Sequence, residues 1–203
     1  MGLYGTRDGK FIVKKLNVQD KIPVQYVIPK TVAYSTGAIM TGEDVNANGT
    51  AAYDNTSILV QPPYAMRLLV TPGAAGTAAN TDALTVVGID AMGIRREEDI
   101  IISSTAATAT PSTYAYAKIT SMTPNAVSKC TDLGIGYDNA VIGLPHPIAS
   151  SGDIVSFAYD GGYSTTLAAD NAFTVEPTYD TMTLTGTAAG KVVQVTYKSK
   201  MQE

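Results

Sequence analysis

The sequence predicts an all-β protein, built as an antiparallel β-sandwich or jelly roll with an extended N-terminal arm. The first observation behind this fold class is composition. Only 16% of the 203 residues are charged, small β-tolerant residues dominate, and there are 12 Tyr against 3 Phe and no Trp, a mixture that suits strands. The second is periodicity. No stretch repeats apolar residues at the three- and four-residue spacing of a helix, whereas short apolar runs recur between turn residues.

Runs bounded by Gly, Pro, Asn or Asp are the candidate strands. The last of them alternates, so that Val193, Val195 and Tyr197 fall on one face. Many short strands with no helix between them favour antiparallel pairing over a parallel α/β sheet. In chain order the candidate strands are Lys10–Leu16, Val24–Ile28, Thr56–Gln61, Met66–Thr71, Leu84–Ile89, Asp99–Ser103, Tyr114–Met122, Asp153–Tyr159, Ala172–Glu176, Thr181–Thr185 and Lys191–Lys198.

A charge asymmetry separates the start of the chain from the rest. Residues 1–34 hold six basic and two acidic side chains, a net +4, and residues 35–203 hold eight basic and sixteen acidic ones, a net −8. We therefore predict an extended basic arm over 1–34 and a β-sandwich body over 35–203. In the alternative interpretation, Lys10–Leu16 is the first strand of the body. The residues expected to contact another subunit are Tyr4, Arg7, Lys10, Phe11, Ile12, Val13, Lys14, Lys15 and Leu16.

The stretch Arg95–Asp99 places five charges between two aliphatic runs. Residues two apart in a strand share a face, which pairs Arg95 with Glu97. The same spacing pairs Arg96 with Glu98, and exposed pairs of this kind contribute about 0–1 kcal/mol each. A catalytic carboxylate pair, as in glycosidases, is the alternative. Because the acids are sequence neighbours and no apolar group is placed to raise a pKa, we interpret the cluster as a solvated bend between two strands.

Side chains that carry chemistry are scarce. One His (His146) and one Cys (Cys130) cannot supply the ligands of a zinc site. Any catalytic triad would need His146, which lies between two prolines and is interpreted as structural or exposed. Gly134 and Gly136 are not followed by the helix of a dinucleotide site. We therefore predict a protein that is not an enzyme and has no metal or cofactor.

The remaining partner classes follow from charge and hydropathy. No apolar stretch reaches the length of a signal peptide or a membrane span, so we expect synthesis in a cytoplasm and no membrane partner. The acidic body would repel phosphates, so no nucleic-acid partner is expected.

Four stretches together resemble the small β-rich structural proteins of tailed-bacteriophage virions, especially head decoration (cement) proteins. They are "LTVVGIDAMGIRREEDIII", "STYAYAKITSMTP", "VIGLPHPIASSGDIVSFAYDGG" and "VEPTYDTMTLTGTAAGKVVQVTYKSK", within roughly residues 66–198. The resemblance implies a jelly roll or sandwich, assembled as a dimer or trimer on the capsid surface of a virion. Its partners would be the major capsid protein and neighbouring copies of itself, because such proteins bridge capsomers and stabilise the head. The family has no catalytic residues to carry over.

Three other functions remain open at this point, and the one that involves catalysis is a hydrolase, which would require His146. A neck, tail or head-fibre component of a bacteriophage particle would have a similar composition and a similar pattern of short strands. A carbohydrate-binding β-sandwich module belongs to another class, but such modules usually stack sugars on exposed aromatic rings, and the chain has no Trp.

Overall fold

The computed structural model describes residues 4–5, 11–12, 21–45, 60–73, 82–125, 130–159, 162–164, 173–184 and 190–199. Within these ranges the chain forms β-strands and one 3-10 turn, η1 (Ser151–Asp153), and the strand pairs are antiparallel. No helix in these ranges is long and apolar enough to span a membrane. The predicted antiparallel β-sandwich is confirmed, whereas the jelly-roll order of strands stays a prediction.

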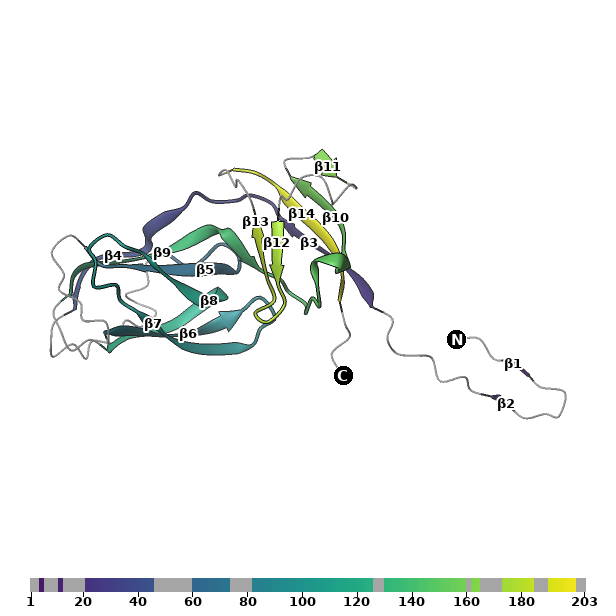
Figure 1. Cartoon of the computed structure of the whole chain (residues 1–203), viewed down its shortest axis with the longest axis horizontal. Helices are drawn as coiled ribbons and strands as arrows, with labels where there is room; N and C mark the ends of the chain where they lie inside the picture. The colour runs from purple at the N-terminus through teal and green to yellow at the C-terminus, as the bar shows by residue number, and fades with distance from the viewer. Residues whose placement is uncertain are drawn as a thin grey trace.

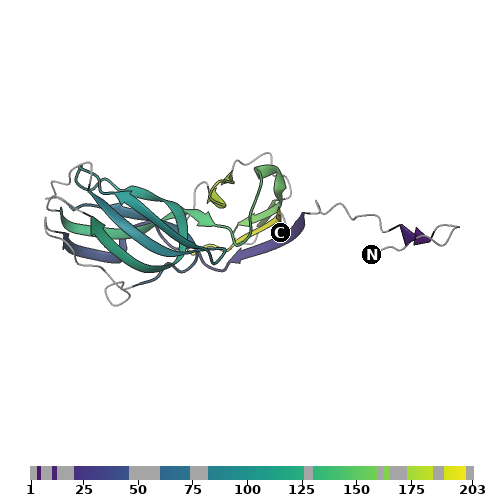
Figure 2. The same cartoon turned by 90° about the horizontal axis from the view of Figure 1, so that it is seen from below.

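The larger sheet has eight strands and curls around its own core (Figures 1 and 2). Its hydrogen-bonded order is β12-β13-β9-β5-β8-β6-β7, and β4 also pairs with β9. Strand β9 has β5 along one edge, with β4 and β13 following one another along the other edge. The strands are β4 (Ser35–Val45), β5 (Met66–Thr71), β6 (Ala83–Asp90), β7 (Arg95–Ile101), β8 (Thr110–Asn125), β9 (Cys130–Gly143), β12 (Phe173–Glu176) and β13 (Thr181–Leu184).

The smaller sheet has four strands in the order β11-β10-β14-β3. Its strands are β3 (Ile22–Ile28), β10 (Ile154–Tyr159), β11 (Gly162–Ser164) and β14 (Val193–Ser199). A separate two-stranded pair, β1 (Tyr4–Gly5) and β2 (Phe11–Ile12), lies away from both larger sheets in the two views (Figures 1 and 2).

Alternating apolar residues give the molecule two cores. The first lies inside the curled sheet and consists of Ile39, Met40, Met66, Leu68, Val70, Leu84, Val86, Ile100, Ile102, Tyr116, Ile119, Met122, Cys130, Leu133, Ile135 and Tyr137. The second lies between the small sheet and the β13 end of the large one and consists of Ile28, Ile142, Leu144, Ile148, Ile154, Phe157, Met182, Leu184, Val193, Val195 and Tyr197. Tyr64 packs against both cores and so joins them.

The segment assigned to the arm contains a strand of the body. Strand β3 pairs with β14 along its whole length, from Ile22 opposite Ser199 to Ile28 opposite Val193. Its alternate residues Val24 and Tyr26 pack against the second core, and Ile28 is buried in it. The predicted boundary at residue 34 is therefore wrong for β3, because this alternation buries one face of the strand. Most of residues 1–20 lie outside the described ranges.

The sequence also concealed the strands β4 and β9. Their Gly, Asp and Asn residues are typical of turns, yet β9 is one of the longest strands. Two of its glycines admit the backbone of β4. A Cβ on Gly136 would lie 1.9 Å from the Ser35 carbonyl oxygen, and one on Gly134 would lie 2.7 Å from that of Thr36. These glycines permit close strand approach, whereas the sequence had suggested only an incomplete nucleotide motif.

Replacing Gly136 by alanine tests this close approach. We expect G136A to lower the free energy of unfolding by about 1–3 kcal/mol, because the new methyl group forces the β4 backbone away from β9. The matched control is G152A in η1, where the nearest atom to an added Cβ is the Ser150 Oγ at 3.5 Å. Urea unfolding followed by circular dichroism measures both, and equal midpoints for the two variants would contradict the interpretation.

Candidate interaction surface

The charged cluster lies in strand β7 rather than in a bend. The turn is the preceding Ala91–Ile94, where Gly93 has a positive φ of 81°. The Asp90 carboxylate accepts the backbone N–H groups of Met92 and Ile94, each at 2.9 Å. The interpretation of the cluster as the bend itself is therefore wrong. Asp90 and Gly93 form the turn. The five charged residues that follow are therefore part of strand β7 and not of the turn.

Alternation divides the cluster between two faces of β7. On the outer face Arg95 and Glu97 form the predicted ion pair at 2.7 Å, with exposed side chains that give it little energetic weight. On the inner face Arg96 and Glu98 do not pair with each other. Arg96 instead donates from Nε to Asp90 Oδ2 at 2.7 Å. Its position opposite Gly88 and beside the turn explains this choice of partner.

Glu98 connects β7 to the first half of β8. Its carboxylate accepts the backbone N–H groups of Thr113 at 2.7 Å and Tyr114 at 3.2 Å, and the hydroxyl of Tyr116 at 3.0 Å. Burial and the nearby carboxylate together raise the pKa of Tyr116, so its hydroxyl stays a neutral donor. Tyr116 is buried, and an unmet buried polar group costs about 1–3 kcal/mol, so Glu98 supplies the acceptor that the Tyr116 hydroxyl needs where the curled sheet closes.

The same cluster reaches the turn between β12 and β13. The Arg96 guanidinium lies over the Tyr114 ring, 4.8 Å from its centroid, and the Tyr114 ring meets Tyr179 edge-on at 5.6 Å. Next to Tyr179, the Asp180 carboxylate accepts the Ile148 N–H at 3.1 Å. Burial raises the pKa of Asp180, the hydrogen bond from Ile148 and the charge of Arg96 oppose this rise, and the charge of Asp90 adds to it. Structural contacts thus account for the polar groups of the cluster.

The other candidates of the sequence are far apart. Cys130 is buried at the start of β9, and exposed His146 follows the end of that strand, so the strand alone separates them by roughly 40 Å. His146 contributes backbone groups to the Tyr197 hydroxyl, each at 3.1 Å. Among the described residues, no three His, Cys, Asp or Glu side chains gather as metal ligands would.

The predicted arm interface falls mostly outside the described residues. Tyr4 lies in β1 opposite Ile12 in β2, and Phe11 lies opposite Gly5. Arg7, Lys10, Val13, Lys14, Lys15 and Leu16 lie outside the described ranges. Their role at an interface stays a prediction.

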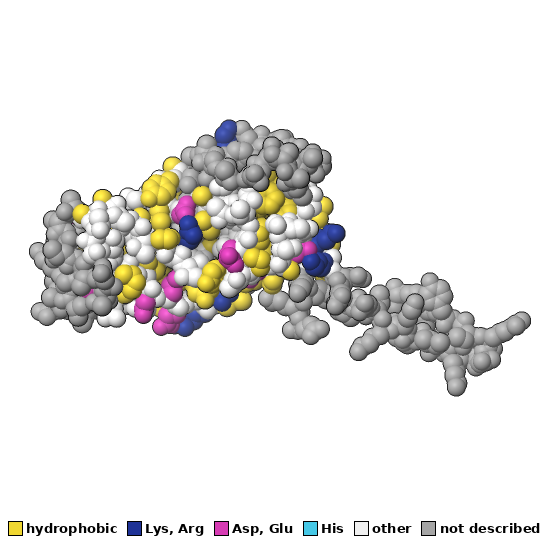
Figure 3. Space-filling model, viewed as in Figure 1, with side chains coloured by type: hydrophobic (Ala, Val, Ile, Leu, Met, Phe, Trp, Pro, Cys, Tyr) yellow, Lys and Arg dark blue, Asp and Glu magenta, His cyan; other side chains and the backbone are white. Residues whose placement is uncertain are grey.

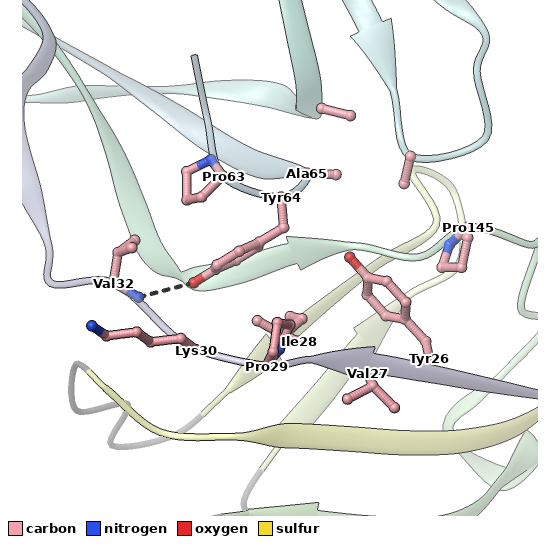
Figure 4. Close-up of a pocket in the computed structure, with 12 residues that line it drawn as sticks. Tyr26, Val27, Ile28, Pro29, Lys30, Val32, Pro63, Tyr64, Ala65 and Pro145 are labelled. Atoms are coloured by element: carbon pink, nitrogen blue, oxygen red, sulfur yellow. Dashed lines mark hydrogen bonds between the residues drawn. The ribbon is translucent and has the colours of Figure 1, made fainter. Parts of the chain in front are cut away.

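An apolar pocket of about 560 Å³ lies between β3 and the large sheet (Figure 4). Its walls include Tyr26 and Ile28 of β3, Tyr64 before β5, Ala117 of β8 and Pro145 after β9. No residue of β14 lines it, so the pocket lies on the side of β3 away from its partner strand.

The two tyrosines give the pocket a neutral polar edge. The Tyr64 hydroxyl accepts the Val32 N–H at 3.4 Å, shown as a dashed line in Figure 4. Burial, with the neighbouring Tyr64, raises the pKa of Tyr26 to about 12. Burial also raises the pKa of Tyr64. Both hydroxyls are therefore uncharged at neutral pH, and the pocket suits apolar groups.

Strand β3 is an edge strand with an open side. One edge pairs with β14, and no strand of the described chain pairs with the other. Ile22 and Val27 are 47% and 45% exposed, which is high for apolar residues of a strand. An open edge of this kind can accept a strand from another chain. The sequence carried a signal for it, since Pro23 within a strand pattern is typical of edges.

Comparison with known proteins identified no relative: no protein-family model, no curated protein and no solved structure matches the chain.

Substitution of Asp180 tests the contact between the β12–β13 turn and the connection that follows β9. A raised folded-state pKa means that the carboxyl stabilises the fold in its protonated form, below its ordinary value of 3.8, and that this contribution is lost as pH rises through the folded pKa. At pH 7 we therefore expect D180N to be at least as stable as the natural protein, and its advantage to shrink toward pH 4. Asparagine also tolerates the positive φ of 50° at this position.

The control is D180A, which removes the acceptor for the Ile148 N–H. We expect a loss of about 1–3 kcal/mol. Urea unfolding at pH 7 and pH 4 gives both free energies. A D180N protein that is less stable than the natural one at pH 7 would show that the hydrogen bond from the Ile148 N–H and the attraction to Arg96 together outweigh burial.

Proposed function

We propose that this chain is a non-enzymatic structural protein of a bacteriophage particle, and that it decorates the capsid as a cement protein. The observation that carries the proposal is the open edge of β3 beside an apolar pocket, because together they make a surface suited to binding another polypeptide. The resemblance of residues 66–198 to head decoration proteins supports the same conclusion. Its partners would be the major capsid protein and neighbouring copies of itself, in a homo-oligomer on the virion surface.

The way the two sheets are joined supports the proposal, because a cement protein needs a stiff body. Each sheet is anchored in a core of buried side chains, and Tyr64 packs against both. The β12–β13 turn is held to the connection after β9 through Asp180, whose carbonyl also accepts the Leu144 N–H at 2.8 Å. Two sheets joined at several points resist being bent apart, so a load applied to one is carried to the other.

The surface is also suited to association. On the described part of the face in Figure 3, charged side chains of both signs are scattered among apolar and uncharged ones. With only 16% charged residues in the chain, little desolvation of charge opposes contact with a neighbour. On a lattice, many modest contacts act together, so each copy needs only moderate affinity for its neighbours.

The copy number in purified particles tests the proposal. We expect this protein to be present in virions at a stoichiometry comparable to that of the major capsid protein, measured by quantitative mass spectrometry. Particles that lack it should lose their packaged DNA at a lower temperature than complete ones. A handful of copies per particle would instead indicate a neck, tail or fibre component, and absence from particles would refute a role in the virion.

Truncation separates the basic segment from the body. We expect a chain lacking residues 1–20 to keep its unfolding midpoint and to bind particles more weakly, because Lys10, Lys14 and Lys15 no longer attract acidic surfaces. Added salt should reduce this difference. A chain lacking residues 1–34 loses β3 and exposes β14. Its free energy of unfolding should fall by at least about 1.5–3 kcal/mol, which is the contribution expected from the burial of Ile28. Equal stability of the two truncated chains would contradict the placement of β3.

A further inference from the structure

The free edge of β3 lies in a positively charged setting. Lys30, just beyond the end of β3, lines the pocket, and no Asp or Glu side chain does. At the other end, exposed Lys198 of β14 lies opposite Pro23. Lys21 contacts the Asp153 carboxylate. Within the described residues, Lys30 and Lys198 have no ion-pair or hydrogen-bond partner. One uncompensated charge therefore lies just beyond one end of β3, and another lies on the neighbouring strand β14, one strand away from the free edge, beside the other end.

This charge pattern distinguishes between possible occupants of the edge. A second copy that paired through its own β3 in the antiparallel sense would bring Lys30 of one copy toward Lys198 of the other. The N-terminal segment of the chain is a poor complement as well, because residues 1–20 hold four basic and two acidic side chains. Like charges face one another in both arrangements, which disfavours them. A strand with acidic residues would instead be attracted to Lys30 and Lys198.

We infer that the free edge of β3 and the adjoining pocket bind an extended segment of a partner protein that is acidic at its ends and apolar at alternate positions between them. The inference rests on the proposed function, in which that partner is a neighbouring protein of the virion. The partner strand would extend the small sheet and bond to the β3 main chain. Its inward side chains would enter the pocket between Tyr26 and Tyr64, which face it in Figure 4.

The spacing of the charges defines the partner further. Position 23, beside Lys198, and position 30 are seven residues apart, which is close to the length of β3 itself. The two acidic residues of the partner should therefore lie about six or seven positions apart in an extended strand. Main-chain bonds give such a site its affinity, while the pocket and the two lysines select the sequence.

A pair of synthetic peptides tests the inference on the full-length chain. Both have the same core, in which valine and isoleucine alternate with threonine, and they differ only in ending with glutamate or with lysine. By fluorescence polarisation we expect the glutamate-ended peptide to bind about tenfold more tightly. The double variant K30E/K198E should reverse this preference. Equal binding of the two peptides, or binding of neither, would overturn the inference.

A second pair of variants tests the pocket. A117L places a larger side chain into the pocket. It should weaken binding of the glutamate-ended peptide about tenfold, because the apolar side chains of the peptide can no longer enter the pocket. The matched control is T123L, at an exposed position of the same strand that does not line the pocket, and it should bind as the natural protein does. Both proteins are first checked for an unchanged unfolding midpoint. Unaltered binding by a folded A117L would overturn the inference.

The other occupants give distinct results. If F11S/I12S in the full-length chain increases peptide binding, the N-terminal segment of the protein occupies the edge. If the protein forms a dimer that V27E dissolves in sedimentation experiments, a second copy occupies it. Either result overturns the inference. These measurements use purified protein, so they can fail while particles still contain many copies, and they can succeed when particles contain none.

Discussion

The fold depends on closing a curled sheet around its own core, and the Glu98 carboxylate links two of the strands that meet at the closure. Strand β7 does not bond to β8 through its backbone in the described sheet. Glu98 instead accepts two backbone N–H groups of β8 and the Tyr116 hydroxyl. The hydroxyl of buried Tyr116 thereby has an acceptor where β7 approaches β8. Val86 and Ile100, on the same inner face, are buried because the sheet is closed above them.

The second sheet follows from how the chain leaves the first. Strand β9 contributes to the first core along most of its length and to the second at Ile142. The connection after it and the β12–β13 turn meet at Asp180, so the small sheet is fixed against the large one. Between β3 and the large sheet the two do not pack completely. The apolar pocket lies there, walled by Tyr26 and Tyr64.

The proposed function depends on the edges of the sheets, where backbone pairing between strands ends. An antiparallel sandwich satisfies its backbone groups internally except at the edges of its sheets. In the small sheet that edge is β3, and the pocket gives it a side-chain preference that a bare edge lacks. The basic residues that precede β3 add a long-range attraction toward acidic surfaces. The basic segment, the edge and one wall of the pocket thus follow one another in the sequence, while the other wall comes from Pro63, Tyr64, Ala65, Ala91, Ala117 and Pro145.

Composition and alternation alone determined the class of fold, because the preference for strands and the burial of every second residue are local properties: Val193, Val195 and Tyr197 were assigned one face and are buried together. Only the tertiary structure decided what the ambiguous residues do. Gly134 and Gly136 suggested a turn or an incomplete motif, and their use became clear only with β4 against them. The role of Glu98 likewise became clear only from its hydrogen bonds to β8, and that of β3 only from its pairing with β14. These partner strands are distant in the sequence, and the local pattern of residues does not specify which distant strand will pair with or pack against them.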